Sequence, residues 1–326
     1  MALHGGAGTI LRSLMTAELE REYRGGLETA LRVGWSVLKN GGSSLDAVES
    51  AVVSLEDFPL FNAGRGSVFT HDGKNEMDAC IMDGARLRAG AVAFVRNVKN
   101  PIKLARLVMS RTEHVLLGGE GANQFAEQMG VEMADDAYFF TDHRYEQLLK
   151  ARDAGIVQLD HSAVELRILD DMPGPDKPPE ARIKGVETVT RSKGTVGAVA
   201  CDSAGVLAAA TSTGGMTNKK FGRIGDTPIV GSGNYADCRC AVSCTGYGEY
   251  FMLSVSAFDV AARMKYKDIS LSQATAEVVE HLTAIGGEGG LIAVDSAGNV
   301  SLPFNSDGMY RGWIDSDGKT VTAVYD

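Results

Sequence analysis

The sequence has few cysteines and no long apolar run, and each shortage excludes a class of protein. It contains 5 cysteines among 326 residues, and an odd number in a long chain indicates reduced thiols instead of a disulfide framework. No apolar stretch approaches the roughly 20 residues that a membrane-spanning helix needs. The beginning of the chain also lacks the charged start and apolar run of a secretion signal. We therefore expect a cytoplasmic protein that does not enter membranes.

Positive charge is also scarce. Lys and Arg total 32 against 42 Asp and Glu, which gives a net charge of -10. Such a balance argues against nucleic acid or an anionic membrane surface as a partner. Hydrophobic residues make up 44% of the chain, which suffices for a buried core in one large domain or two smaller ones.

A metal site built from cysteines is not expected either. The segment "CRCAVSC" brings Cys238, Cys240 and Cys244 close together in sequence. It lacks the C-x-x-C spacing of zinc sites, and no histidine is near enough in sequence to complete a ligand set. Small buried residues are the plainer interpretation.

Proline is rare except in one segment. Half of the 8 prolines, Pro173, Pro175, Pro178 and Pro179, lie among charges in "DDMPGPDKPPEARIKGVETVTRSK". Such a composition buries too little apolar surface to offset the entropy of ordering. We expect a mobile linker over about 170–193.

The remaining sequence shows helices and strands on both sides of this linker. Apolar periodicity and capping signals predict helices over the ranges 16–40, 43–57, 101–112, 249–267 and 270–287. Short apolar runs predict a strand over 89–98 and strand-turn-strand units over 195–212 and 290–304, while "HGGAGTI" predicts a strand end and a glycine-rich turn. Runs of both kinds favour an α/β protein in which helices cover sheets.

Thr195 stands where the linker meets a predicted strand. An internal threonine hydroxyl needs an adjacent base to act as a nucleophile, and no histidine occurs between His161 and His281. An N-terminal threonine differs, because its own α-amino group serves as the base. Cleavage after Gly194 would expose that group. On local sequence alone, a hydroxyl that merely starts a strand is the commoner interpretation.

Several longer blocks favour the nucleophile. They are "LHGGAGTI", "GGSSLDAVESAV", "PLFNAGRGSVFT", "MDACIMDG", "GTVGAVACD", "ATSTGGMTNKKFGRIGDTPIVGSGNYAD" and "SCTGYGEYF". In order and spacing the chain resembles, over nearly its whole length, the plant-type (type 2) asparaginases and isoaspartyl peptidases, or β-aspartyl peptidases. These belong to the N-terminal nucleophile (Ntn) hydrolase superfamily.

The resemblance implies a fold and an activity. The fold is an α/β four-layer αββα sandwich, a single domain formed from two autocleaved chains. An α subunit of residues 1–194 would include the linker, and a β subunit of residues 195–326 would begin at the nucleophile. A dimer of such αβ heterodimers is implied as well. The activity is hydrolysis of β-aspartyl amide bonds, from L-asparagine to L-aspartate and ammonia, and from isoaspartyl dipeptides to aspartate and an amino acid.

The resemblance also implies roles for single residues. It makes Thr195 the nucleophile, freed by cleavage of the Gly194–Thr195 bond. Thr213 would bond to it and tune it, and Asn62 would position it. Thr245 and Gly246 would form the oxyanion hole and also contact the substrate.

Two charged residues in "GRIGD" would bind the substrate. Arg223 would clamp the α-carboxylate and Asp226 the α-ammonium, chemistry that suits a planar guanidinium and a carboxylate. Without the resemblance, a surface salt bridge three residues apart would be the default interpretation.

No cofactor is expected for catalysis. The segment "LEDFPLFNAGRG" resembles the family loop that binds a structural sodium ion through backbone carbonyls, here those of Leu55, Glu56, Phe58, Phe61, Ala63 and Arg65. Activation by potassium stays open.

Other functions remain to be weighed. A phosphate-binding enzyme is disfavoured because the lysine in "KGTVGA" precedes the glycine. A non-catalytic binding protein that never cleaves, a glycosylasparaginase and a specific threonine protease are further alternatives. Tyr247 and Arg65 depart from residues frequent in the family, so the preference between asparagine and β-aspartyl dipeptides is open.

Overall fold

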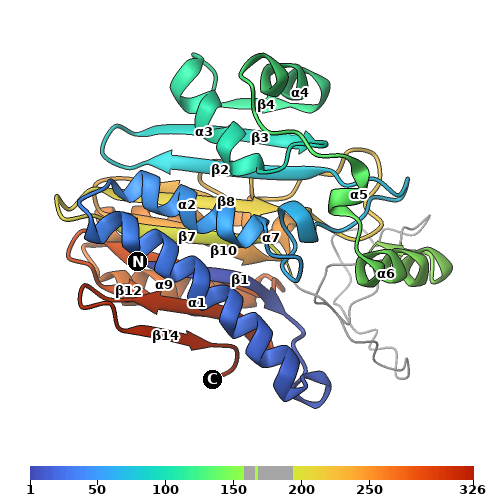
Figure 1. Ribbon diagram of the computed structural model, residues 1–326. Coiled ribbons are helices and arrows are strands. Elements are labelled where there is room, and N and C mark those ends of the chain that lie inside the picture. The colour runs from blue at the N-terminus through green and yellow to red at the C-terminus, as the bar shows by residue number, and fades with distance from the viewer. Residues whose placement is uncertain (158–165, 168–193) are drawn as a thin grey trace.

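The computed structural model describes residues 1–157, 166–167 and 194–326 (Figure 1). The segment expected to be a mobile linker, about 170–193, lies outside the described residues.

The larger sheet runs through the centre of the molecule. Its eight strands follow the order β14-β13-β1-β7-β8-β2-β3-β4, and paired neighbours are antiparallel except β3 and β4. The strands are β1 (Ala2–Gly8), β2 (Met77–Asp83), β3 (Arg88–Val95), β4 (Leu116–Gly118), β7 (Val196–Cys201), β8 (Leu207–Thr213), β13 (Gly308–Ile314) and β14 (Thr320–Ala323).

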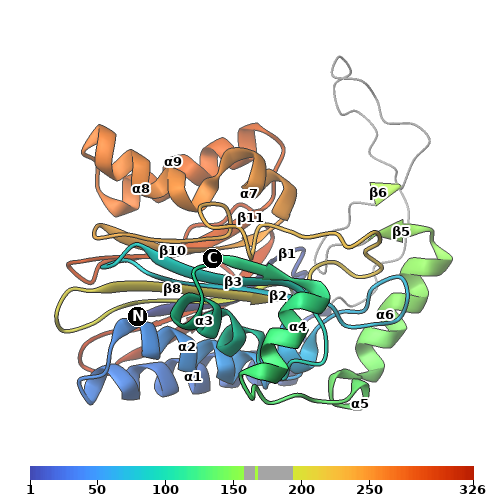
Figure 2. The same cartoon turned by 90° about the horizontal axis from the view of Figure 1, so that it is seen from above.

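Helices cover one face of this sheet. They are α1 (Ala17–Lys39), α2 (Ser44–Glu56) and α3 (Pro101–Arg111), which lie together on one side in Figure 2. The largest buried cluster joins them to the sheet, for example Leu27 and Val52 to Ala198. The apolar stripe on each helix accounts for this packing, because burial of apolar surface is the main stabilising contribution.

The other face of the larger sheet meets a second sheet. This sheet has four strands in the order β12-β11-β10-β9, namely β9 (Asn234–Ala236), β10 (Cys240–Gly246), β11 (Gly289–Asp295) and β12 (Val300–Ser301). Small and medium side chains fill the space between the sheets, among them Val199, Ala209 and Ile292. Strands with a two-residue period send Val199 to this interface while Ala198 and Ala200 face the helices.

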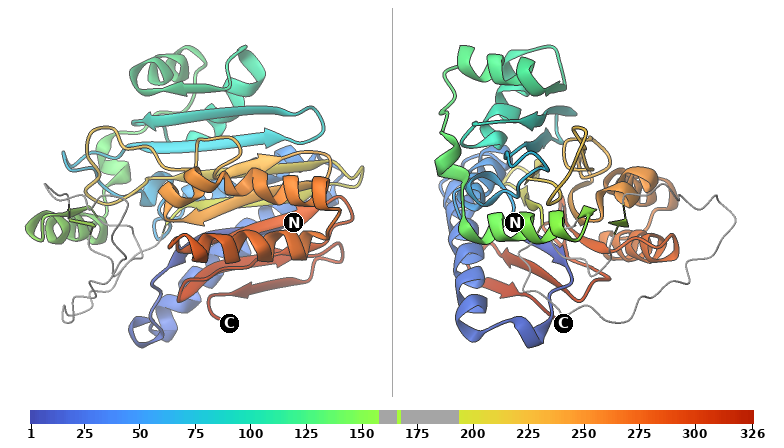
Figure 3. Two further views of the ribbon diagram at one scale, coloured as in Figure 1. Left: turned by 180° about the vertical axis from the view of Figure 1, so that it is seen from behind. Right: turned by 90° about the vertical axis from the view of Figure 1, so that its right-hand side faces the viewer.

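The second sheet is covered in turn by α7 (Gly248–Ser254), α8 (Ser256–Lys267) and α9 (Leu271–Ala284). Their buried residues form a third cluster with the strands, which includes Phe251, Val260 and Val242. Figures 2 and 3 show these helices on the opposite side of the two sheets from α1 and α2. The prediction of an α/β protein with helices packed on sheets is confirmed.

The remaining elements connect those above. They are η1 (Arg12–Leu14), η2 (Gly64–Gly66), α4 (Gly119–Gln128), α5 (Asp136–Phe139), α6 (Asp142–Asp153), β5 (Ile156–Val157) and β6 (Leu166–Arg167). In the sequence η1 follows β1, η2 follows α2, and the others lie between β4 and β7. None of the helices within the described residues is both long enough and apolar enough to span a membrane.

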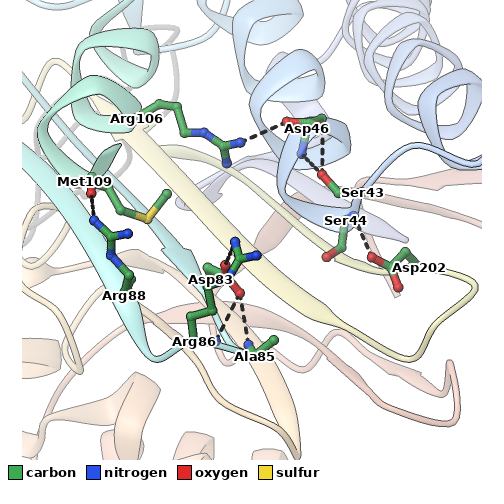
Figure 4. Close-up of polar contacts among 10 residues, drawn as sticks. All are labelled: Ser43, Ser44, Asp46, Asp83, Ala85, Arg86, Arg88, Arg106, Met109 and Asp202. Carbon is green, nitrogen blue, oxygen red and sulfur yellow. Dashed lines mark hydrogen bonds and ion pairs between the residues drawn. The ribbon is translucent and has the colours of Figure 1, made fainter. Parts of the chain in front are cut away.

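Capping and polar contacts fix the start of α2. Ser43 caps the helix, since its Oγ accepts a hydrogen bond from the Asp46 backbone N–H at 3.1 Å. The Arg106 guanidinium of α3 pairs with the Asp46 carboxylate, and the Ser44 N–H donates to Asp202 in the β7–β8 turn (Figure 4). These contacts fix the start of α2 between α3 and the turn that joins β7 to β8.

Two sequence predictions differ from the structure. The helix predicted over 249–267 is broken at Val255, which has a φ of 50° and separates α7 from α8. The break redirects the chain so that the N–H groups of Ala257 and Phe258 reach the carbonyls of Ser232 and Gly231. The turn predicted within "HGGAGTI" is instead part of β1, which continues through a bulge between His4 and Gly6.

Candidate active site

A cavity lies where β7, β8 and β10 end. Thr195 directly precedes β7, Thr213 is the last residue of β8, and Gly246 is the last residue of β10. The cavity is lined by Ala7, Gly8, Gly194, Thr195, Thr213, Gly215, Met216, Arg223, Gly225, Asp226, Thr227, Gly246, Tyr247 and Glu288. The structure thus brings most of the predicted site residues to one place, although they are scattered along the sequence.

The Thr195 hydroxyl is directed at a second threonine. Thr195 Oγ1 donates to Thr213 Oγ1 at 3.1 Å, and Thr213 Oγ1 also accepts from the Gly215 N–H at 3.0 Å. Only 8% of Thr195 is exposed. Among the described residues, no histidine ring or carboxylate lies within hydrogen-bonding distance of this hydroxyl.

The Thr195 carbonyl is held from the other side. His4 Nδ1 lies 3.0 Å from the carbonyl oxygen, and the Thr245 hydroxyl donates to it at 3.5 Å. Thr245 Oγ1 in turn accepts from the Ala7 N–H at 3.3 Å. His4 therefore touches the backbone of Thr195 and not its hydroxyl.

The bond between Gly194 and Thr195 runs against the glycine-rich part of β1. Gly6 has a φ of 115°, and a Cβ on it would lie 2.7 Å from the Gly194 carbonyl oxygen. Both the backbone conformation and the close approach require glycine here. Gly6 of the segment "HGG" therefore lies directly against the Gly194 backbone.

Arg223 makes an ion pair that the sequence did not indicate. Its Nε and Nη2 donate to the two carboxylate oxygens of Glu249 at 2.9 and 2.8 Å. Arg223 is thus not paired with Asp226 through a salt bridge, which was the default interpretation of the three-residue spacing. Both residues line the cavity.

Asp226 is buried at the cavity wall. Its Oδ2 has no hydrogen-bond partner among the described residues. Burial raises the pKa of Asp226 to about 7, against the opposing effect of the Arg223 charge. Glycines make room for it, since a Cβ on Gly233 would lie 2.8 Å from Oδ2 and one on Gly248 would lie 2.7 Å from Oδ1. An unpaired buried carboxylate at a cavity is suited to a cationic ligand group.

Thr245 and Gly246 occupy the end of β10. Gly246 lines the cavity, while the Thr245 side chain is directed at the Thr195 carbonyl. Gly246 has a φ of 144° and lies against the backbone of Glu288 and Gly289. This conformation favours glycine and turns the chain from β10 into α7.

Asn62 supports the loop after Thr213. Its Nδ2 donates to the Gly215 carbonyl at 2.8 Å, and its Oδ1 accepts from the Val68 N–H at 3.0 Å. Gly215 is also the residue whose N–H reaches Thr213. Within the described structure Asn62 therefore contacts the loop beside Thr213 and makes no direct hydrogen bond to Thr195.

Comparison with known proteins agrees with this geometry. A family model described as Asparaginase matches residues 1–324. The chain belongs to the asparaginase family. It is 50% identical to the isoaspartyl peptidase of Salmonella typhimurium over 100% of this chain and 98% of that protein. It is 49% identical to the isoaspartyl peptidase of Escherichia coli (100% and 95% covered) and 41% identical to the isoaspartyl peptidase/L-asparaginase of Xenopus laevis (95% and 90%).

Membership in the asparaginase family makes the chain a hydrolase of amide bonds, and it confirms the resemblance inferred from the sequence. The alternative of a phosphate-binding enzyme is thereby excluded. Within the described residues of this family member, no three His, Cys, Asp or Glu side chains gather closely enough to hold a metal ion.

In the loop predicted to hold sodium, the carbonyl oxygens of Glu56 and Phe61 lie directly against two glycines. A Cβ on Gly64 would lie 2.5 Å from the Glu56 carbonyl oxygen, and one on Gly66 would overlap that of Phe61. The Ala63 carbonyl accepts one backbone N–H, that of Gly66, which leaves a lone pair on its oxygen, whereas the Leu55 carbonyl already accepts from Asp57 and Phe58. Backbone oxygens of this kind suit a hard cation.

The Glu56 side chain is engaged elsewhere. Its Oε1 accepts from Ser212 Oγ at 2.6 Å and from the Ile102 N–H at 3.1 Å. Burial raises the pKa of Glu56 to about 8, and its Oε2 has no hydrogen-bond partner among the described residues. Arg65 is exposed and its guanidinium stacks over Tyr138, 5.6 Å from the ring centroid. It does not line the cavity, whereas Tyr247 does.

Sequence reasoning missed two residues that contact the site. His4 and Glu249 both lie in blocks that carry the family resemblance, "LHGGAGTI" and "SCTGYGEYF". Neither was given a role, because their partners Thr195 and Arg223 lie far from them along the chain.

Proposed function

We propose that this protein is a self-cleaving N-terminal threonine hydrolase of β-aspartyl amide bonds. It would convert L-asparagine to L-aspartate and ammonia, and isoaspartyl dipeptides to aspartate and an amino acid. One observation carries the proposal: the buried Thr195 hydroxyl, bonded to Thr213, shares a cavity with the Arg223 guanidinium and the unpaired Asp226 carboxylate. The names of the related proteins, isoaspartyl peptidase and L-asparaginase, support the same substrate class.

The lack of a side-chain base beside Thr195 supports cleavage after Gly194, because cleavage would supply the base that turnover needs. An internal threonine needs a base within hydrogen-bonding distance, and none of the described side chains supplies one to Thr195. A free α-amino group has a pKa of about 7.7–8.0 and is neutral often enough near neutral pH to take the proton. The precursor would thus become an α chain, residues 1–194, and a β chain, residues 195–326.

The two chains would form one four-layer αββα sandwich of the Ntn hydrolase type. The layers described above support this assignment, with helices outside and two sheets between them. The expected linker, about 170–193, would belong to the end of the α chain. A dimer of αβ heterodimers remains a proposal that rests on the family resemblance.

The reaction follows from the positions of the groups. Thr195 Oγ1 attacks the side-chain carbonyl of the substrate, and the Thr195 amine takes the hydroxyl proton. Thr245 and Gly246 would stabilise the oxyanion, to which one such donor contributes roughly 3–4 kcal/mol. For this role the Thr245 hydroxyl, which donates to the Thr195 carbonyl, would have to turn towards the cavity. Ammonia or an amino acid leaves with a proton, and water then hydrolyses the acyl-enzyme to release aspartate.

Substrate binding would use the two charged groups of the cavity. Asp226 would accept from the α-ammonium, which supplies the partner that its carboxylate lacks. Arg223 would fork onto the α-carboxylate. Because the guanidinium already binds Glu249, the substrate would have to compete with that carboxylate or share the arginine with it.

The substrate assay tests this proposal. Purified, cleaved protein should release aspartate from asparagine and from β-aspartyl dipeptides. The α-aspartyl isomers are the matched control and should remain intact. Arg223→Ala should still cleave at Gly194. Its kcat/KM should fall by an amount that corresponds to about 2–4 kcal/mol of transition-state binding, since a charge-assisted contact is lost. Failure to hydrolyse any β-linked substrate would reject the function.

We also propose a sodium ion in the carbonyl loop between Leu55 and Arg65, as a structural and not a catalytic group. The spare lone pair on the Ala63 carbonyl and the closely packed carbonyls of Glu56 and Phe61 support it. Exchange of sodium for choline at constant ionic strength should lower the midpoint of thermal unfolding, and an unchanged midpoint would reject the site. The five free cysteines fit a reducing compartment such as the cytoplasm.

A further inference from the structure

A row of polar side chains lies between the two sheets, directly behind Thr195. His4 of β1, Gly197 of β7 and Thr211 of β8 stand opposite one another in neighbouring strands. Ser243 of β10 reaches this row from the facing sheet. Its Oγ lies 2.8 Å from His4 Nε2 and 2.8 Å from Thr211 Oγ1. Asn234, which pairs with Ser243 across β9 and β10, donates its Nδ2 to Thr211 Oγ1 at 2.9 Å.

Gly197 makes this contact between the sheets possible. A Cβ at this position would overlap both Ser243 Oγ and His4 Nε2. The side chains of the row are fully buried, namely His4, Thr211, Asn234 and Ser243. Each of these four side chains has a hydrogen-bond partner within the row, while Asn234 Oδ1 lacks one among the described residues. Hydrogen bonds between buried polar groups fix the orientation of the groups that make them.

The chemistry of the two ends gives the hydrogen bonds one direction. The Thr195 carbonyl only accepts, so His4 Nδ1 must carry the proton. His4 Nε2 then accepts from the Ser243 hydroxyl. Ser243 accepts in turn from Thr211, because the 2.8 Å contact is much shorter than the 3.4 Å approach of the same Thr211 hydroxyl to the Gly233 carbonyl. Thr211 accepts from the Asn234 amide. Each donor points toward Thr195. Burial lowers the pKa of His4 to about 3, in agreement with a neutral ring that carries a single proton.

We propose that this chain of hydrogen bonds makes His4 a positioning residue, which fixes the carbonyl of Thr195 and thereby its hydroxyl and amine. The inference rests on the proposed function. Before cleavage, residue 195 is held by peptide bonds on both sides. Afterwards only its carbonyl side is attached, and a tilt of that carbonyl would carry Cα, with its hydroxyl and amine, away from Thr213.

This role predicts an effect on turnover and not on binding. His4 does not line the cavity, whereas Arg223 and Asp226 do. Loss of these hydrogen bonds should therefore lower kcat and leave KM unchanged. A purely structural role would change stability without this separation of kcat from KM.

The first test uses Thr211, for which the chain offers a matched pair of variants. Thr211→Val keeps the shape and removes the hydroxyl, while Thr211→Ser keeps the hydroxyl and removes a methyl. The kcat of Thr211→Val, counted per cleaved molecule, should be about 3- to 10-fold lower than that of wild type, which corresponds to the loss of one hydrogen bond. Thr211→Ser should stay near wild type. If KM rises while kcat is unchanged, Thr211 acts on the binding loop through its contact with Gly233, and the inference is wrong.

The second test changes His4 itself. His4→Asn places an amide N–H near the position of Nδ1, whereas His4→Gln places it near Nε2. We expect His4→Gln to lose about 10- to 100-fold in kcat through misplacement of the nucleophile, and His4→Asn to restore part of that loss. Equal kcat in both variants and wild type would overturn the inference. If the His4 variants fail to fold or cleave, the Thr211 pair decides.

These outcomes are separable from those of the proposed function. A wild-type protein that hydrolyses no β-aspartyl substrate contradicts the function itself. A wild-type protein that is active, with variants that are equally active, contradicts only the positioning role of His4.

Discussion

At the scale of single residues, Asp226 connects burial with pH dependence. Burial raises the pKa of its carboxyl to about 7, and Oδ2 lacks a partner among the described residues. The nearby Arg223 guanidinium, which would favour the charged form, is bound to Glu249. Below the pKa, the carboxyl is protonated and its charge is unavailable to an ammonium group. Above it, the carboxylate is free to bind one.

The activity should therefore rise with pH through about 7. If cleavage frees the Thr195 amine as proposed, kcat/KM would report both Asp226 and that amine, whose ordinary pKa is about 7.7–8.0. Asp226→Asn should abolish the rise of kcat/KM with pH that is due to the carboxyl. At pH values above the Asp226 pKa it should lower kcat/KM by about 10- to 100-fold. The measurement is kcat/KM for asparagine from about pH 5 to about pH 9 in both proteins. Identical pH profiles of the two proteins would show that a group other than Asp226 causes the rise.

Local sequence predicted little of this site by itself. Thr195 stood out because it follows a linker, yet the same pattern also suits a strand start. The family resemblance supplied Thr213, Arg223 and Asp226, and the structure places them around one cavity. Glu249 and His4 were missed because their contacts depend on tertiary packing, which no short motif encodes.

At the scale of elements, capping chemistry defines the helices. In α9, Ser270 Oγ accepts from the Gln273 N–H, and the Gln273 side chain accepts from the Ser270 N–H. This capping box satisfies two donors that the first helical turn leaves unpaired. α9 packs on the second sheet, whose β10 carries Gly246.

Ser270→Ala should destabilise the protein by about 1 kcal/mol, because the cap is lost while the buried face of α9 is unchanged. Ser272→Ala, an exposed change within the same turn, is the control and should have little effect. Thermal unfolding of both variants checks the prediction. Equal midpoints for the two variants would show that the cap does not stabilise this helix.

Element boundaries were predictable where such signals are local. Thr16 and Ser43 cap α1 and α2, and Pro101 begins α3, close to the predicted ranges. The break between α7 and α8 was not predictable, because it depends on the carbonyls of Gly231 and Ser232 in a distant loop. Val255 alone gives no sign of a left-handed conformation.

At the scale of the whole molecule, the strands from either side of Gly194 alternate within one sheet. β7 pairs with β1 on one side and with β8 on the other. β8 then pairs with β2, and β1 also pairs with β13. The α/β class was predictable from the runs of helices and strands, but this pairing order was not, since it joins segments such as His4 and Gly197 that are far apart in sequence.

Cleavage should therefore leave the molecule in one piece. The two fragments share hydrogen-bonded strand pairs and the buried cluster between sheet and helices. We expect size-exclusion chromatography to show both fragments in one peak under native conditions. Denaturant should be needed to separate them. Fragments that elute apart without denaturant would contradict the shared sheet.

The N-terminal sequence of the active protein tests the central claim most directly. The smaller fragment should begin at Thr195 with Thr-Val-Gly-Ala, and its amount should parallel the activity. Thr195→Ala should remain a single inactive chain, because the attacking hydroxyl is absent. Full activity in a protein whose bond between Gly194 and Thr195 is intact would contradict the account.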